Sequence, residues 1–138
     1  CNDMFFGPKD NLILPGRAKN MGDGWETKRK RKLPGHDWVV VRLGAPGRLD
    51  EIELDTNHFK GNFPDRASLE GARLSGDVIT EAAAARARWV KILPEQKLKA
   101  HHRHFFKRLA AHGPFTHVRM NIFPDGGVSR LRLWGRPG

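Results

Sequence analysis

The chain has 138 residues, of which 38% are hydrophobic and 29% charged, and its net charge at pH 7 is +10. This composition is typical of one globular domain. No apolar run approaches the ~20 residues that a membrane-spanning helix needs, and a single cysteine excludes an internal disulfide. The cations are scattered without a nucleic-acid-binding motif, so we expect neither a nucleic-acid nor a membrane partner. One cysteine also favours a reducing compartment, which we take as the cytoplasm.

The first 30 residues are predicted to contain no regular element. Two apolar patches bounded by Pro8 and Pro15 indicate an extended, packed lead-in over residues 1–20. Residues 20–29 are predicted to form a loop, because Gly22 and Gly24 flank Asp23 in a pattern typical of tight turns. This loop also carries an indole, a carboxylate, a hydroxyl and cations, which makes it a candidate binding loop.

The remainder is rich in β-branched and aromatic residues, which favour strands. We expect strands over residues 36–43, 49–55, 67–72, 89–93, 97–106, 117–122 and 128–134. The turns between them are predicted at 44–47, at Pro94 and, as a hairpin, at 124–127. One short helical insertion is expected near residues 78–88, capped by Asp77 or Thr80. Short strands separated by turns predict an all-β fold, an antiparallel β-sandwich.

Three segments resemble the allantoicase family: GDGWETKR at 22–29 with PGHDW at 34–38, DTNHFKGN at 55–62, and HVRMNIFPDGGVSRL at 117–131. They occur in the family's order and are distributed along most of the chain, from residue 22 to residue 131. The resemblance implies a jelly-roll sandwich of the galactose-binding-domain-like type, with residues 1–138 as one repeat, the C-terminal one, of a two-repeat protein. The alanine-rich segment near residues 80–88 departs from the family pattern.

The resemblance implies a hydrolase of purine catabolism that converts allantoate and water to ureidoglycolate and urea. It also implies a homo-oligomer in which this repeat packs against a second one. The alternative is a non-catalytic sandwich module that binds a small ligand or supports a catalytic partner repeat.

Hydrolysis of allantoate requires a cation for its carboxylate, amide or carboxylate groups for its ureido groups, and groups that move protons. The motifs supply all of these. The candidate catalytic residues are Asp23, Glu26, Asp55 and His58. The candidate substrate-binding residues are Trp25, Arg29, Asn57, Lys60, Asn62, Asn121 and Arg130.

Structural roles remain open for the same residues. Asp23 suits a turn, Trp25 suits a packing anchor, and Glu26 could pair with a neighbouring cation. Metal chemistry is also open: His102 and His104 would share one strand face, and a divalent ion such as Mn²⁺ could use the candidate carboxylates and His58. No zinc-hydrolase motif is present, so no cofactor is assigned. If the first two motifs form one site, their loops must meet at one end of the sandwich.

Overall fold

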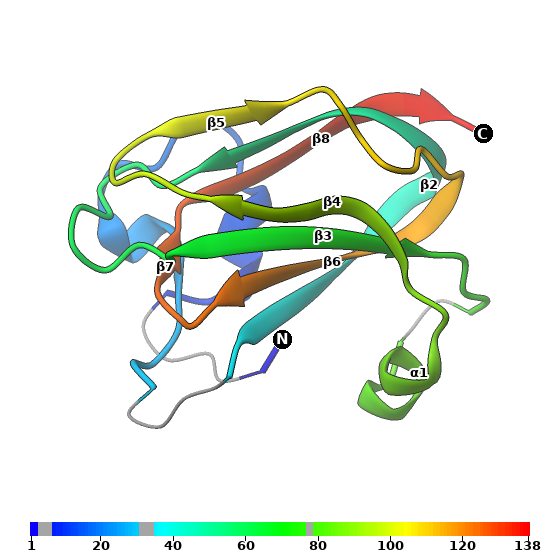
Figure 1. Ribbon diagram of the computed structural model, residues 1–138, viewed down its shortest axis with the longest axis horizontal. Helices are drawn as coiled ribbons and strands as arrows, with labels where there is room; N and C mark the ends of the chain where they lie inside the picture. The colour runs from blue at the N-terminus through cyan, green and yellow to red at the C-terminus, as the bar shows by residue number, and fades with distance from the viewer. Residues whose placement is uncertain (3–6, 31–34, 77–78) are drawn as a thin grey trace.

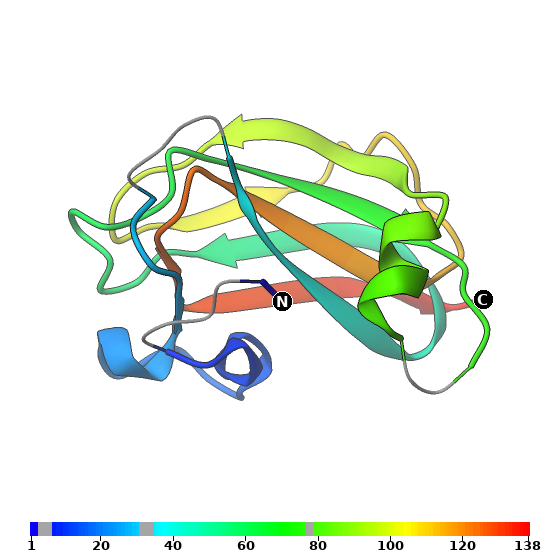
Figure 2. The same cartoon turned by 90° about the horizontal axis from the view of Figure 1, so that it is seen from below.

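The computed structural model describes residues 1–2, 7–30, 35–76 and 79–138. Its chain forms two packed layers of antiparallel strands with one short helix at the side (Figures 1 and 2). The predicted antiparallel jelly-roll sandwich is therefore confirmed. In chain order, the elements are the 3₁₀ turns η1 (Lys9–Ile13) and η2 (Met21–Asp23), β1 (Trp25–Glu26), β2 (Asp37–Asp55), β3 (Arg66–Ala72), α1 (Glu81–Arg86), β4 (Val90–Lys97), β5 (Arg103–Phe106), β6 (Phe115–Phe123), β7 (Gly127–Val128) and β8 (Arg130–Pro137).

Strand β2 belongs to both layers. Its first half pairs with β6 and completes the layer β4-β3-β6-β2. Its second half lies between β5 and β8 in the other layer. The turn predicted at 44–47 is wrong, because the chain stays extended there and only shifts register between Arg42 and Gly47. The glycines and Pro46 thus mark the place where one strand bends from one layer into the next.

The alternation of side chains along the central strands builds the core. On β6, Val118, Met120 and Ile122 are completely buried between the layers. Their neighbours Arg119 and Asn121 face outward, as a period of two requires. The core also takes in Trp25 from β1, so the loop motif contributes to packing.

Several predicted boundaries are wrong. Strand β4 continues through Pro94, which an edge strand tolerates where the register shifts between Ala67 and Leu69 of β3. The strand predicted at 97–106 is confined to Arg103–Phe106. The segment 124–127 is not a hairpin, because β6 pairs with β2 and β3 whereas β8 pairs with the second half of β2.

The N-terminal and helical predictions are partly confirmed. The lead-in contains the 3₁₀ turn η1, and the loop at 20–29 contains η2 and β1, which pairs with β7. Residues 3–6 lie outside the described residues. The helix is shorter than predicted, and its N-cap is Thr80, whose hydroxyl accepts a hydrogen bond from the Ala83 N–H at 3.0 Å. Asp77, the other predicted cap, lies outside the described residues.

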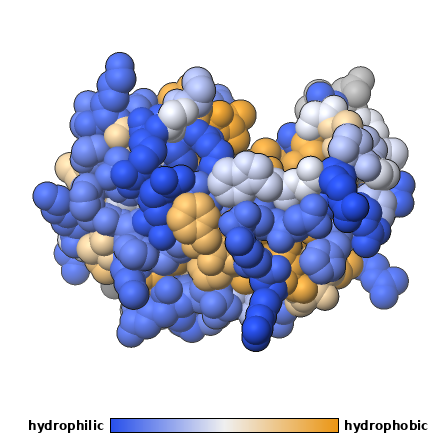
Figure 3. All heavy atoms as spheres, turned by 90° about the horizontal axis from the view of Figure 1, so that it is seen from above, coloured by the Kyte–Doolittle hydropathy of each residue, from blue (hydrophilic) through white to orange (hydrophobic). Residues whose placement is uncertain are grey.

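Across the described residues, no helix is long and apolar enough to cross a membrane. The face seen from above is mostly hydrophilic, and its hydrophobic side chains gather in small separate areas (Figure 3).

Candidate functional site

Trp25 and Asp23 anchor the loop at 20–29 to the rest of the chain. Strand alternation in β1 turns the indole of Trp25 into the core, where it is 0% exposed, and leaves Glu26 facing outward, half-buried. The Asp23 carboxylate accepts a hydrogen bond from the Lys19 N–H at 3.2 Å and one from Arg130 Nη2 at 3.0 Å. These two donors hold the pKa of Asp23 below its ordinary value, the backbone N–H contributing most.

Arg130 is buried and spends its guanidinium on protein acceptors. Besides the Asp23 carboxylate, it donates to the carbonyls of Gly16 at 3.0 Å, of Ser129 at 2.7 Å and of Asp23. Only 3% of its side chain is exposed. Arg130 therefore holds the lead-in and the 20–29 loop against the start of β8.

A second ion pair fastens the lead-in to the end of β2. Asp55, buried, accepts a bidentate pair of hydrogen bonds from Arg17 at 3.0 and 3.2 Å and a third from the Asn57 N–H at 3.0 Å. The hydrogen bond from Arg17 to Asp55 raises the pKa of Arg17. The side chains of Asn57 and His58 both bond the Ala18 carbonyl, at 3.0 and 2.9 Å. These three candidates thus lie together, and all contact the lead-in.

The loop of the first motif and the loop of the second motif meet at one cavity. A hollow of about 440 Å³ is lined by Glu26, Thr27, Arg29, Gly61, Asn62, Phe63, Asp65, Pro124, Asp125 and Gly126. Asn62 donates a hydrogen bond to Oε2 of Glu26, which joins the first motif to the second across the floor. The third motif enters through Asp125, whose carboxylate accepts a hydrogen bond from the Lys30 N–H at 2.7 Å. We refer to this cavity as the loop hollow.

The loop hollow brings together Glu26, Arg29 and Asn62 among the sequence candidates. Asn121 lies elsewhere, on the outer face of β6, and Lys60 is exposed outside the lining. Asp65 and Asp125 also line the loop hollow, although neither was among the site residues predicted from the sequence. The motif at 117–131 contains Asp125, but its place in an expected hairpin suggested a turn residue.

The two histidines predicted to share a strand face, His102 and His104, differ in their burial. His104 is buried, with one ring nitrogen 2.9 Å from the Leu54 carbonyl and the other accepting the Lys99 N–H at 2.8 Å. His102 is exposed, and the two rings lie 4.8 Å apart. Burial lowers the pKa of His104. Within the described ranges, no group of three or more His, Cys, Asp or Glu side chains is arranged to hold a metal ion.

Comparison with known proteins identifies relatives along the whole chain. The family model for the allantoicase repeat matches residues 1–138. A protein named "Probable allantoicase" from Pseudomonas aeruginosa (strain LESB58) is 56% identical over 138 residues, which are 99% of this chain and 41% of that protein. Another of that name from Ralstonia nicotianae is 54% identical over 135 residues, 97% of this chain and 40% of that protein.

Solved structures give the same result. The crystal structure of allantoicase from Saccharomyces cerevisiae is 37% identical, with a TM-score of 0.80 over 97% of this chain and 38% of that one. A fragment from Bacteroides thetaiotaomicron, 15% identical with a TM-score of 0.66, shares only the fold, over 96% of this chain and 78% of its own. The chain spans about 41% of the length of the curated relatives it matches.

Proposed function

The chain belongs to the allantoicase family, and we propose that it supplies one repeat of an enzyme that hydrolyses allantoate to ureidoglycolate and urea. The observation that carries the proposal is the loop hollow. There, the contact between Asn62 and Glu26 places a carboxylate, an amide and the Arg29 loop around one cavity. A small anion with two ureido groups needs that combination.

The residues of the loop hollow divide the chemistry among them. Arg29 binds the substrate carboxylate, because a guanidinium can grip two carboxylate oxygens at once. Glu26, oriented by Asn62, removes a proton from the attacking water. The water oxygen bonds to the central carbon, the bond from that carbon to one ureido nitrogen breaks, and the nitrogen takes up a proton as urea leaves. Asp125, half-buried and held by the Lys30 N–H, is the carboxyl group placed to carry that proton.

We further propose that the remainder of the protein provides a second repeat, against which this one packs, and that the enzyme is a cytoplasmic homo-oligomer. The support for the second repeat is that this chain spans about 41% of relatives that carry the allantoicase name.

The second candidate function is a supporting module without its own activity. It is favoured by the structural use of Asp23, Asp55 and Arg130, which leaves fewer groups for chemistry than the motifs suggested. The two functions differ in whether the loop hollow works alone or only beside another repeat.

Urea release from allantoate tests the proposal in this chain and in the full-length protein. We expect Glu26→Gln in the full-length protein to lower kcat by about 100-fold or more, the usual size of acid–base contributions. Glu51→Gln makes the same change in the second half of β2, outside the loop hollow, and is the matched control. Full activity in Glu26→Gln would refute the catalytic role of the loop hollow and favour the supporting module.

A further inference from the structure

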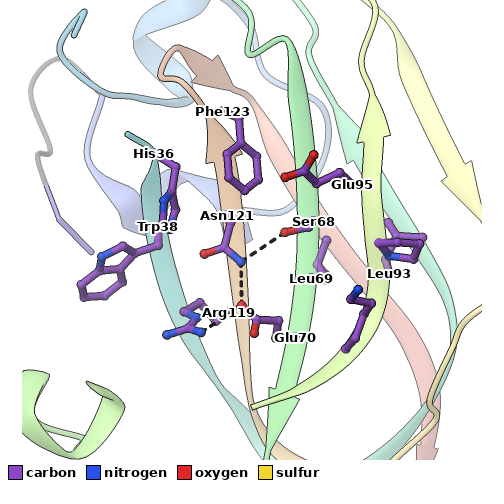
Figure 4. Close-up of a pocket in the computed structure, with 12 residues that line it drawn as sticks. His36, Trp38, Ser68, Leu69, Glu70, Leu93, Glu95, Arg119, Asn121 and Phe123 are labelled. Atoms are coloured by element: carbon purple, nitrogen blue, oxygen red, sulfur yellow. Dashed lines mark hydrogen bonds and ion pairs between the residues drawn. The ribbon is translucent and has the colours of Figure 1, made fainter. Parts of the chain in front are cut away.

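A second hollow, of about 860 Å³, lies on the outer face of the β4-β3-β6-β2 layer (Figure 4). It shares no lining residue with the loop hollow. Its residues come from all four strands of the layer, and Asn121 is among them. We refer to this cavity as the sheet hollow.

The floor of the sheet hollow is a hydrogen-bonded row on β3 and β6. Asn121, only 4% exposed, donates from Nδ2 to Oε1 of Glu70 at 2.8 Å and to Oγ of Ser68 at 3.2 Å. Arg119 donates to the same Glu70 oxygen from Nη2 at 2.9 Å and from Nε at 3.2 Å. The bond from Asn121 to Glu70 and both bonds from Arg119 end on Oε1. The other oxygen of this part-exposed carboxylate, Oε2, takes part in none of the three.

Aromatic rings line the margin of the sheet hollow, and the helical insertion is joined to it through the contact of Trp89 with Arg119. The rings of His36 and Phe123 stack with centroids 5.1 Å apart, and Figure 4 shows the Phe123 ring above Asn121. At the other end, the Arg119 guanidinium lies over the Trp89 ring at 4.5 Å. The Trp89 indole N–H donates to the Ala84 carbonyl of α1 at 2.8 Å, so the alanine-rich helix is attached to this margin.

Both carboxylates that line the sheet hollow are already paired, Glu70 with Arg119 and Glu95 with Arg66, whose guanidinium lies 5.7 Å from the centroid of the Phe123 ring. The remaining lining cation, Lys91, is exposed, and ion pairs at exposed positions contribute little. A net anion would therefore gain little from this hollow. A neutral ligand that offers both donors and acceptors can bond the floor without leaving a buried charge unpaired.

We propose that the sheet hollow binds a neutral, planar ureide, a molecule in which a carbonyl lies between N–H groups. Its N–H groups bond Oε2 of Glu70, its carbonyl accepts from Arg119, and its flat face lies against the aromatic margin. This site goes beyond the proposed activity, because it selects an uncharged ligand whereas the loop hollow offers Arg29 to an anion.

Titration of the full-length protein with hydantoin, a neutral cyclic ureide, tests this inference by NMR of the indole N–H signals. We expect the signals of Trp38 and Trp89 to shift and those of Trp25 and Trp134 to stay. Glu70→Gln should weaken binding at least tenfold, whereas Glu51→Gln in the other layer should leave it unchanged. Ser68→Leu, which adds bulk to the floor without removing a charge, provides a second variant if Glu70→Gln does not fold.

Other outcomes would overturn the inference. The first is that the Trp38 and Trp89 signals do not shift at the solubility limit of hydantoin. The second is that folded Glu70→Gln and Ser68→Leu variants bind hydantoin as tightly as the unmodified protein does. The third is that the hollow binds a neutral disaccharide in place of hydantoin. The Glu26→Gln variant separates this inference from the proposed function, since it should lose urea release and keep hydantoin binding. Normal urea release without hydantoin binding would refute the sheet hollow alone.

Discussion

Replacing Arg130 by Met tests whether this buried guanidinium serves structure or substrate. Met fills much of the volume of the Arg stem but supplies no donor. The carbonyls of Gly16, Ser129 and Asp23 would each lose a charged hydrogen bond. We therefore expect a large loss of stability, even though Arg130 stands within a motif of the family resemblance.

The magnitude follows from those three bonds. Hydrogen bonds to charged groups contribute ~1.5–3 kcal/mol each, so three bonds at the low end give about 4.5 kcal/mol. Gly16 is exposed, and water can replace its lost donor, which lowers the expected loss to about 3 kcal/mol. For a domain of this size, ~1 kcal/mol corresponds to roughly 3–5 °C in Tm, so Tm should fall by about 10 °C.

Thermal and urea denaturation measure this loss, and allantoate kinetics on the folded variant separate the two roles. Arg136→Met is the matched control, because Arg136 is 72% exposed and only 3.6 Å from Asp50, and its loss should cost about 0.5 kcal/mol or less. An Arg130→Met variant with unchanged Tm and a KM raised tenfold or more would refute the structural role and make Arg130 a substrate-binding residue.

Three further predictions concern stability. Burial lowers the pKa of both His104 and His117 below the ordinary value, so both side chains bind protons more readily in the unfolded chain than in the folded one. Their contribution to the free energy of unfolding should therefore be complete above about pH 6.5, the ordinary pKa of histidine. It should decline as the pH falls below that value. Denaturant midpoints from pH 8 to 5 measure this, and a flat profile would contradict it. Gly127→Ala should destabilise by about 2 kcal/mol or more, since its Cβ would lie 1.9 Å from the buried Phe59 ring, and a urea midpoint equal to that of the unmodified chain would show that the ring can yield. Thr80→Ala should cost about 1 kcal/mol through the lost N-cap, detectable as faster amide exchange in α1, with an unchanged exchange rate as the contrary result.

Local patterns predicted the centre of the fold better than its connections. Alternation correctly placed Val118, Met120 and Ile122 in the core. Strand β6 is paired with β2 on one side and β3 on the other, so alternate side chains face the core along its length. The turn residues at 44–47 mark a bend within β2 and not a turn, and those at 124–127 connect β6 to β7 without forming a hairpin, because turn chemistry does not determine which strands pair afterwards. Pairing depends on long-range contacts, and β2 uses its two halves in different layers.

The same distinction applies within the candidate site. Charged and aromatic residues are dense in the 22–29 motif, which suggested that most of them act on substrate. The structure shows instead that building the loop consumes several of them, because a loop held at one geometry needs buried anchors. Trp25 anchors it in the core and Asp23 pairs with Arg130.

What remains for chemistry follows from one geometrical fact. Strand alternation in β1 sends Trp25 inward and therefore sends Glu26 outward, where Asn62 of the second motif meets it. A shift of one residue in the pairing of β1 with β7 would exchange the two side chains, burying the carboxylate and exposing the indole. The pairing of Trp25 with Val128 thus links the packing of the core to the position of the candidate base. Core substitutions at Val128 should lower activity together with stability, whereas substitutions at Phe115, a core residue at the opposite end of β6 from the loop hollow, should lower stability alone.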